Sequence, residues 1–427
     1  MKKIYKPQQA DWQEVLRRPT QTVAAIEEIV NQVFTAIRQE GDTALRAYTE
    51  KFDGVVLEDL EVTLEEIRAA QALVPEALKD AIKMAKRNIE TFHKAQITKR
   101  VAIETVPGVR CWQEKRPIQK VGLYIPGGTA PLFSTILMLA IPAIIAGCQD
   151  IVLCSPPNKE GKIHPAILYT ASLCGLTQIY KVGGIQAIAG MTFGTESVPK
   201  VYKIFGPGNQ YVTVAKQLAT KYGVAIDMPA GPSELLVVAD DSANAAFVAS
   251  DLLSQAEHGA DSQVILVSTS KRMIDDVGAE VANQIKVLPR KEIAQQAIDN
   301  SKLIYMDDDI SAMALINEYG PEHFIICTEN EDFYLENIKN AGSVFIGDYT
   351  PESAGDYASG TNHTLPTNGY AKQYSGVNLD SFMKGMTFQK ISKEGIKAIG
   401  GAIEIMAEAE GLQAHRNAVT LRLNSLK

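Results

Sequence analysis

The sequence predicts an α/β protein with two parallel-sheet domains and small helical extensions at its N- and C-terminal ends. From about residue 119 onward, short β-rich runs alternate with longer helical segments, a pattern typical of parallel sheets. The chain has 427 residues, and at about 100–200 residues per domain it can form at least two cores. Its hydrophobic fraction of 46% and charged fraction of 22% are ordinary for a globular protein.

Charge and cysteine content narrow the class of protein. The net charge of −8 argues against binding to nucleic acid or to an anionic membrane, since both need a basic face. The five cysteines are odd in number and form no CxxC pair, which favours reduced thiols over a disulfide framework. The start, MKKIYKPQQADW, lacks the apolar region of a signal peptide. We therefore predict a cytoplasmic protein with neither nucleic acid nor membrane as a partner.

The first half of the chain contains helices followed by a first set of strands. Residues 20–105 have apolar positions at helical spacing, and one helix ends at Gly41. The apolar stretch 131–147 contains Pro142 and is predicted to be a buried helix, because it is short for a membrane span. Four β-rich runs are expected to be strands of one sheet: VGLYIP, IVLCSP, QIYKVG and VYKIFG.

A second set of strands follows, interrupted by helices expected over 242–258 and near 271–284. Its strands are predicted at ELLVVAD, SQVILVST, HFIICT and AGSVFIG. A coil-rich stretch over 350–375 and a helical tail over 393–427 end the chain. The expected division is an N-terminal arm (1–20), a nucleotide-binding domain (109–233), a second domain (21–108 with 234–375) and a C-terminal tail (376–427).

Glycine runs follow three of the predicted strands, although no GxGxxG motif opens a helix. Glycine at the carboxyl end of a strand lets the backbone approach a phosphate, and ligands of open α/β sheets bind at this edge. The bland alternative is that the glycines only turn strands into helices. The runs are Pro126-Gly127-Gly128, Gly183-Gly184 and Gly206-Pro207-Gly208-Asn209.

Two polar groups are candidates for chemistry. Gln255 and His258 are three residues apart near a helix end at Gly259, so both side chains lie on one face and can converge on one ion. The alternative is a histidine favoured by the helix dipole. Glu322 and His323 stand before a strand, where successive side chains point opposite ways and could serve two proton transfers. The alternative is a solvated glutamate beside a packed histidine.

Two further groups lie near the C-terminus. The polar loop from Gly355 to Thr367 carries Asp356 and His363, or is an ordinary turn with a loop histidine. The tail carries EGLQAH, which could be a helix cap followed by a surface histidine. Histidine, aspartate and glutamine donors suit zinc or a similar divalent ion. The residues alone predict an α/β enzyme with a possible metal requirement.

At these residues the sequence resembles the histidinol dehydrogenase family. The matching segments stand in family order from residue 121 to about 420, and several are eight residues or longer. They are VGLYIPGG, KIFGPGNQYVTVAK, IDMPAGPSELLVVAD, DLLSQAEHG, GPEHF, ASGTNHTLPT and EGLQAHRNAV. The fold expected from this resemblance is a pair of incomplete Rossmann-like domains in an aldehyde-dehydrogenase-like arrangement.

The resemblance implies a zinc-dependent enzyme that oxidises L-histidinol through L-histidinaldehyde to L-histidine with two NAD, the last steps of histidine biosynthesis. It also implies a homodimer in which the tail completes the partner's site. Glu322 and His323 would accept protons, and Tyr124, Gln186 and Asn209 would contact NAD. One zinc per subunit would be held by Gln255, His258, Asp356 and His415. Substrate contacts would fall on Ser233, Gln255, His258, His323, Asp356, Glu410 and His415.

Alternatives stay open at this point. A related zinc and NAD dehydrogenase could act on another small polar alcohol, although Glu410 could pair with the ammonium group of an amino alcohol. A zinc hydrolase or a non-catalytic metal-binding protein would leave the glycine runs or the Glu322–His323 pair unexplained. An aldehyde could also be held by a thiol, with Cys111 and Cys148 as candidates, but neither has an activating neighbour in the sequence. We therefore favour hydration by water.

Overall fold

The computed structural model describes residues 1–19, 23–127, 131–229 and 231–427. The chain forms two compact units. The first unit comprises Met1–Gln96 and Gln119–Phe382, and the second comprises Ile97–Ile118 and Met383–Lys427. In the described part of the chain, no helix has both the length and the hydropathy that a membrane span requires.

The first unit contains a five-stranded parallel sheet in the order β6-β5-β4-β7-β8. The chain starts this sheet at β4, builds outward through β5 and β6, and then returns to place β7 on the other side of β4. The strand order therefore reverses between β4 and β7, which is where ligands of open parallel sheets bind. The strands are β4 (Lys120–Tyr124), β5 (Asp150–Ser155), β6 (Gln178–Lys181), β7 (Lys203–Phe205) and β8 (Ala225–Ile226).

Helices cover this sheet, and several come from the N-terminal part of the chain. Side chains of α2 and α3 share a core with those of α8, α9 and the sheet, while α4 packs on α7 and α5 packs on α6. The sequence division placed residues 21–108 with the other sheet. An amphipathic pattern shows that a helix buries one face, but it does not say against which sheet. The helices are α2 (Val23–Glu40), α3 (Asp42–Asp53), α4 (Leu64–Leu73), α5 (Glu76–Ala95), α6 (Phe133–Ala146), α7 (Pro165–Leu173), α8 (Gly184–Phe193) and α9 (Gln210–Lys221).

A six-stranded parallel sheet in the order β1-β11-β10-β9-β12-β13 completes the first unit. Its edge strand β1 comes from the segment that the sequence suggested to be an arm. The segment pairs with β11 because KKIY offers a β-prone run whose Ile4 packs against the core. The strands are β1 (Lys2–Tyr5), β9 (Glu234–Ala239), β10 (Gln263–Ser268), β11 (Lys302–Tyr305), β12 (His323–Cys327) and β13 (Ser343–Ile346).

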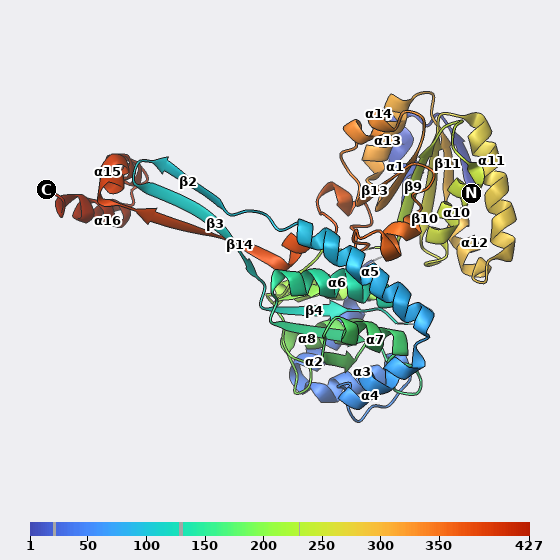
Figure 1. The fold of residues 1–427 in the computed structure, drawn as a ribbon, viewed down its shortest axis with the longest axis horizontal. Helices are drawn as coiled ribbons and strands as arrows, with labels where there is room; N and C mark the ends of the chain where they lie inside the picture. Colours follow the sequence, from blue (N-terminus) through green and yellow to red (C-terminus); the bar gives the residue numbers. More distant parts are fainter. Residues whose placement is uncertain (20–22, 128–130, 230) are drawn as a thin grey trace. The chain divides into compact units, whose positions relative to one another are not determined.

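Helices cover both faces of this sheet. A strand such as ELLVVA requires this, because its apolar side chains point to both faces. Leu235 and Val237 face the core with α10–α12, whereas Leu236 and Val238 face the core with α1, α13 and α14 (Figure 1). The helices are α1 (Trp12–Val15), α10 (Ala245–Ala256), α11 (Lys271–Gln284), α12 (Lys291–Asp299), α13 (Asp309–Tyr319) and α14 (Glu331–Asn337). Two parallel α/β sheets confirm the predicted fold class.

The second unit is an antiparallel sheet in the order β14-β3-β2 with two helices, α15 (Lys393–Ala409) and α16 (Gln413–Asn424). The tail helices agree with the sequence prediction, but the strands correct it. Most of β2 falls in the stretch 20–105, which was expected to be helical, and β14 falls in the C-terminal tail (376–427), where no strand was expected. Trp112 and Phe388 stack across β3 and β14 with ring centroids 5.3 Å apart. The strands are β2 (Val101–Val106), β3 (Val109–Pro117) and β14 (Met383–Ile391).

Candidate active site

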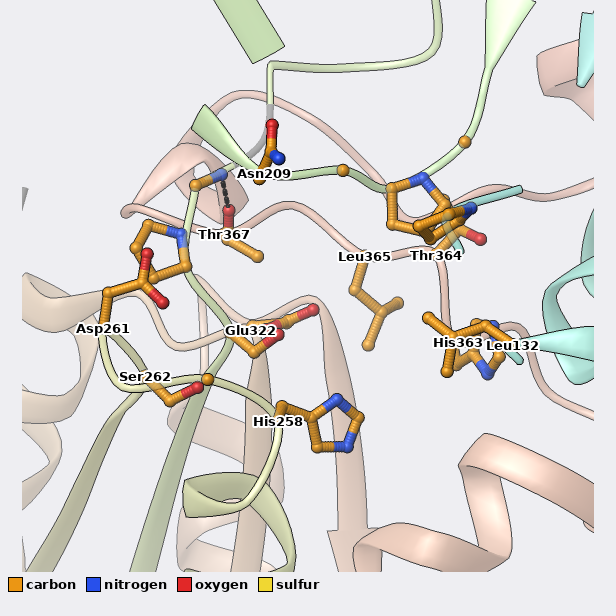
Figure 2. Close-up of a pocket in the computed structure, with 18 of the residues that line it drawn as sticks. Leu132, Asn209, His258, Asp261, Ser262, Glu322, His363, Thr364, Leu365 and Thr367 are labelled. Atoms are coloured by element: carbon orange, nitrogen blue, oxygen red, sulfur yellow. Dashed lines mark hydrogen bonds between the residues drawn. The ribbon is translucent and has the colours of Figure 1, made fainter. Parts of the chain in front are cut away.

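A cleft of about 440 Å³ lies in the first unit beside the glycine run after β7 and the loops that precede β9 and β12. Figure 2 shows His258, Glu322 and His363, from three separate segments, among the side chains that line it. Asn209 and Ser233, both predicted site residues, also line it. The cleft therefore joins predicted nucleotide contacts to predicted chemical groups.

The metal-ligand pair predicted on α10 is present at the end of that helix. Asn244 caps its start by accepting the Ala246 N–H. Gln255 is buried, with its side chain between the Glu352 carboxylate and the Glu234 backbone N–H. His258 follows the helix and projects into the cleft, where the surrounding protein lowers its pKa and the charge of Asp356 opposes this effect. Gln255 is thus buried, whereas His258 faces the cleft.

The predicted proton acceptors Glu322 and His323 are both buried at the start of β12. A Glu322 carboxylate oxygen accepts the Glu234 N–H at 2.8 Å, and His323 Nδ1 lies 3.2 Å from the Glu234 carbonyl oxygen. A proton on Nδ1 satisfies that carbonyl and leaves Nε2 as the acceptor. His323 Nε2 has no hydrogen-bond partner among the described residues, although it lies 3.6 Å from Asp356 Oδ1. The geometry thus presents a free imidazole nitrogen.

Burial and charge set the titration of this pair. Burial raises the pKa of Glu322 to about 8, although the neighbouring His323 and the Glu234 N–H oppose the shift. Burial alone would lower the pKa of His323, but the charges of Glu322, Glu352 and Asp356 outweigh it and raise this pKa to about 10. The surrounding carboxylates therefore favour the protonated form of His323.

Glu352 is a site residue that the sequence did not single out. It is buried, accepts a hydrogen bond from Ser254 Oγ at 2.9 Å, and lies 3.6 Å from His323 Nδ1. Donor atoms of His323, Glu352 and Asp356 all lie within 4.8 Å of one another, close enough to surround a metal ion. A lone glutamate after Pro351 carries no pattern that would have identified it. Burial raises its pKa, whereas the contact of Asp356 with His323 lowers the pKa of Asp356.

The loop that carries Asp356 is held by His363. The ring of His363 places Nδ1 2.8 Å from the Asp356 carbonyl oxygen and Nε2 3.0 Å from Thr135 Oγ1 at the start of α6. Asp356 itself lies in a π-helical turn, Ala354–Ala358. Thr367 also accepts the Gly231 N–H (Figure 2). This loop therefore connects helix α6 with the segment leading into β9.

The predicted nucleotide contacts form two groups. The Tyr124 hydroxyl accepts the Gly184 N–H at 3.2 Å, and Gln186 Nε2 donates to Asp53 Oδ2 at 3.0 Å, while Gln186 Oε1 is buried without a partner among the described residues. Asn209 instead caps α9 by accepting the Val212 N–H at 3.1 Å. Gly128, in the run after β4, lies outside the described residues.

A buried ion pair supports the glycine run after β7. Lys216 Nζ lies 2.5 Å from Asp227 Oδ1 and donates to the Gly206 carbonyl oxygen at 2.8 Å, while Asp227 Oδ2 accepts the Gly206 N–H at 2.8 Å. A Cβ on Gly206 would overlap the Tyr124 carbonyl oxygen, and its φ is +131°. Only glycine fits where β4 and β7 diverge, so this run is more than a generic turn.

The Asp53–Gln186 contact predicts a pH-dependent gain in stability. Burial raises the pKa of Asp53 to about 6 against a weaker opposing effect of the Gln186 hydrogen bond, so ionised Asp53 destabilises the folded state above that pH. We expect Asp53→Asn, which can still accept from Gln186, to stabilise by about 1 kcal/mol at pH 8 after discounting for partial exposure. The gain should shrink as the pH falls from 6 toward 4.

Urea unfolding at several pH values measures this effect. Asp59→Asn, in the loop that follows α3, is the control and should leave the stability nearly unchanged over the same range. A gain from Asp53→Asn that is constant with pH would contradict the role of the buried charge.

The remaining predicted residues lie elsewhere. Ser233 directly precedes β9. Glu410 and His415 belong to the second unit, where Glu410 ends α15 and His415 lies in α16, and both are exposed. The structure therefore gathers Gln255, His258 and Asp356 within the first unit, and it describes the two tail residues only within their own unit.

The fold has two parallel α/β sheets and a cleft lined by histidine and carboxylate side chains, an arrangement that fits the class of α/β enzymes. The family described as histidinol dehydrogenase matches residues 16–423. Histidinol dehydrogenase of Bacteroides thetaiotaomicron is 59% identical over 427 residues and both chains are covered completely. That of Escherichia coli K12 is 54% identical over 417 residues, 97% of this chain and 95% of the relative.

A crystal structure of histidinol dehydrogenase from Elizabethkingia anophelis superposes with a TM-score of 0.97 at 57% identity, covering 100% of this chain and 98% of that one. The chain belongs to the histidinol dehydrogenase family and is an oxidoreductase. The resemblance noted in the sequence is thereby confirmed.

Proposed function

We propose that this enzyme oxidises L-histidinol through L-histidinaldehyde to L-histidine in the cytoplasm, with two NAD and one zinc ion per subunit. Family membership supports the substrate and the pathway. The observation that supports the chemistry best is the buried Glu322–His323 pair. The Glu234 N–H bonds the Glu322 carboxylate, and the Glu234 carbonyl oxygen contacts the His323 ring. If the substrate were another small polar alcohol, its oxidation would use the same Glu322–His323 pair.

The donor set fits zinc. Gln255, His258 and Asp356 offer amide, imidazole and carboxylate donors, which are borderline to hard ligands, and His258 and Asp356 interact electrostatically. When bound, zinc supplies an attachment point for nitrogen atoms of the substrate and a positive charge that offsets the buried carboxylates. Such a charge would favour the neutral imidazole of His323, which is the form that accepts protons.

We propose that His415 supplies the fourth ligand and Glu410 a contact to the substrate ammonium, both from the tail of a second subunit in a homodimer. Family resemblance supports this assignment. The exposed imidazole of His415 and carboxylate of Glu410 are available for such contacts.

The residues of the cleft divide the work in two oxidations. His323 Nε2 takes the hydroxyl proton of histidinol as the carbon-bound hydrogen leaves with its electron pair for the nicotinamide, which yields the aldehyde. Glu322 then takes a proton from water, whose oxygen adds to the aldehyde carbon while protonated His323 returns its proton to the carbonyl oxygen, which yields the hydrate and a neutral His323. His323 accepts a hydroxyl proton of that hydrate as the second hydride leaves, which yields the carboxylic acid. Positioned bases of this kind contribute about 10²–10⁴-fold each.

A thiol route is less well supported. Cys148 is a candidate nucleophile in the first unit, but burial raises its pKa to about 12, so little thiolate forms near neutral pH. Cys111 lies in β3 of the second unit and has no histidine near it in the sequence. The buried carboxylate of Glu322 beside the cleft favours water as the attacking group.

We propose that NAD binds at the carboxyl ends of the strands of the five-stranded sheet, near Tyr124, Gln186 and Asn209. We expect Gly206→Ala to raise the KM for NAD about tenfold or more, since the methyl group would displace the Tyr124 backbone beside the cleft. Steady-state kinetics and thermal melting measure this. Gly223→Ala is the control, because Gly223 also has a positive φ of +80° but open space around it. An equal change in KM in both variants would contradict a specific role for the Tyr124–Gly206 contact.

NADH formation from L-histidinol tests the proposed function. Two NADH per histidinol, with loss of activity on chelation and recovery on addition of zinc, are expected. No NADH would overturn the proposal. One NADH per substrate would instead indicate an alcohol dehydrogenase that stops at the aldehyde or prefers another alcohol.

A further inference from the structure

The geometry points to Arg18 as a positioning residue for the Glu322–His323 pair, acting through Glu234. The inference rests on the proposed function, because it assigns Arg18 a part in that reaction. Arg18 lies in the segment after α1, far in sequence from all the proposed site residues, and it touches neither the cleft nor any proposed ligand. Its effect on chemistry would have to pass through other groups.

Glu234 holds both proton acceptors with its backbone. Its N–H donates to Glu322 at 2.8 Å and its carbonyl oxygen lies 3.2 Å from His323 Nδ1. Glu234 is the first residue of β9, and His323 is the first residue of β12, its neighbour in the sheet. A small shift or rotation of the Glu234 peptide therefore moves both acceptors together and changes the direction of His323 Nε2.

The side chain of Glu234 fixes that peptide, and Arg18 is its main partner. Arg18 pairs with Glu234 in a fork, with Nε bonded to one carboxylate oxygen and Nη2 2.8 Å from the other. Arg18 Nη2 also donates to the Tyr319 carbonyl oxygen at 2.9 Å, and the guanidinium lies 4.0 Å from the centroid of the Tyr319 ring. Five planar donors and a flat face make these contacts possible together, which a lysine could not reproduce.

The same carboxylate also reaches the loop beside the cleft. Glu234 Oε1 accepts the Asn368 N–H at 2.6 Å, one residue after Thr367, which lines the cleft. Glu234 is about 1% exposed, so without Arg18 its charge would have no cationic partner among these contacts. A buried carboxylate in that situation draws in water, turns away or takes up a proton, and each of these changes alters the contacts that hold the Glu234 peptide, which orients Glu322 and His323.

An ordinary ion pair that only adds stability is the competing explanation, and kinetics separate the two. Arg18→Ala is expected to lower kcat between about 10- and 100-fold, the scale of a misplaced reacting group, with little change in the KM for histidinol. Arg18→Lys should fall between wild type and Arg18→Ala. Millimolar guanidinium should restore part of kcat in Arg18→Ala alone, because the side chain of Arg18 is partly exposed and its vacated site opens toward solvent.

Arg17→Ala is the matched control. Arg17 is the adjacent arginine, and its side chain forms an exposed pair with Glu14 at 3.1 Å, so kcat should not change. Circular dichroism checks that each variant is folded at the assay temperature. If Arg18→Ala does not fold, Arg18→Lys carries the test, and a kcat equal to that of wild type overturns the inference.

Crystal structures of Arg18→Ala and Arg17→Ala give a readout that needs no substrate. Glu322 and His323 should be displaced in the first variant and unmoved in the second. Unchanged positions in both variants, or equal kcat in Arg18→Ala, Arg18→Lys and wild type, overturn the role of Arg18. If the wild-type protein fails to oxidise histidinol, the proposed function is overturned. The positions of Glu322 and His323 in the Arg18→Ala crystal structure still test the role of Arg18.

Discussion

Replacing His323 with asparagine is expected to slow both oxidations by about 10²–10⁴-fold, because the only proposed base for the two hydroxyl protons would be lost. Glu322→Gln should spare oxidation of histidinol and slow oxidation of histidinaldehyde, since the amide that replaces the carboxylate cannot take a proton from water. Stopped-flow measurement of NADH, started from the alcohol or from the aldehyde, separates the two steps. Equal losses in both steps for both variants would contradict the division of labour.

The pH profile adds a second signature for Glu322. Since burial raises its pKa to about 8, the carboxyl group is protonated and inactive as a base below that pH. Oxidation of the aldehyde should therefore speed up as the pH rises through about 8, and this rise should disappear in Glu322→Gln. The first oxidation should not show the same dependence on this residue.

Mixed dimers should reveal whether the tail serves a second subunit. His258→Asn and His415→Asn are each expected to be inactive, because each removes one imidazole of the proposed zinc site. Unfolding and refolding the two together should recover about a quarter of wild-type activity, since half the dimers are hybrids with one intact site. If the tail served its own chain, every hybrid site would carry one defect and no activity would return.

A pair of variants within the first unit is the control for that experiment. His258→Asn mixed with Asp356→Asn should stay inactive, because both ligands come from the same chain and each hybrid site lacks one of them. Recovery in this control would show exchange of larger parts of the chain than the tail.

Most strands of both parallel sheets could be predicted because they are short apolar runs followed by glycine or a polar loop, whereas the short strands β1, β8 and β11 were not predicted. The antiparallel sheet could not be predicted, since β3 reads VRCWQEKRP and is only partly buried, so charged residues hide its alternation. The sequence also could not predict which sheet the N-terminal helices pack against. Their apolar faces are plain, but the choice of sheet depends on contacts far apart in the chain.

The candidate site was predictable where a motif placed donors close together. Gln255 and His258 share a helix end, and Glu322 adjoins His323, whereas Asp356 and the tail residues entered through family resemblance. Glu352 and Arg18 have no local signal, because their partners come from distant segments. Glu234 did offer one, since a glutamate opening the buried run ELLVVA must find a cationic or hydrogen-bonding partner.

The pairing of β1 with β11 has a consequence for how the chain is made. On the ribosome, Lys2–Tyr5 emerges long before its partner, Lys302–Tyr305, and cannot pair with it until that segment has been synthesised. The five-stranded sheet, built from Lys120–Ile226, closes over a much shorter stretch and can form earlier. A bulky tag fused directly before Lys2 would therefore lie next to a strand that pairs late, and a tag fused after Lys427 would adjoin the tail proposed to enter a partner. For heterologous expression, a short, cleavable N-terminal tag is the better compromise.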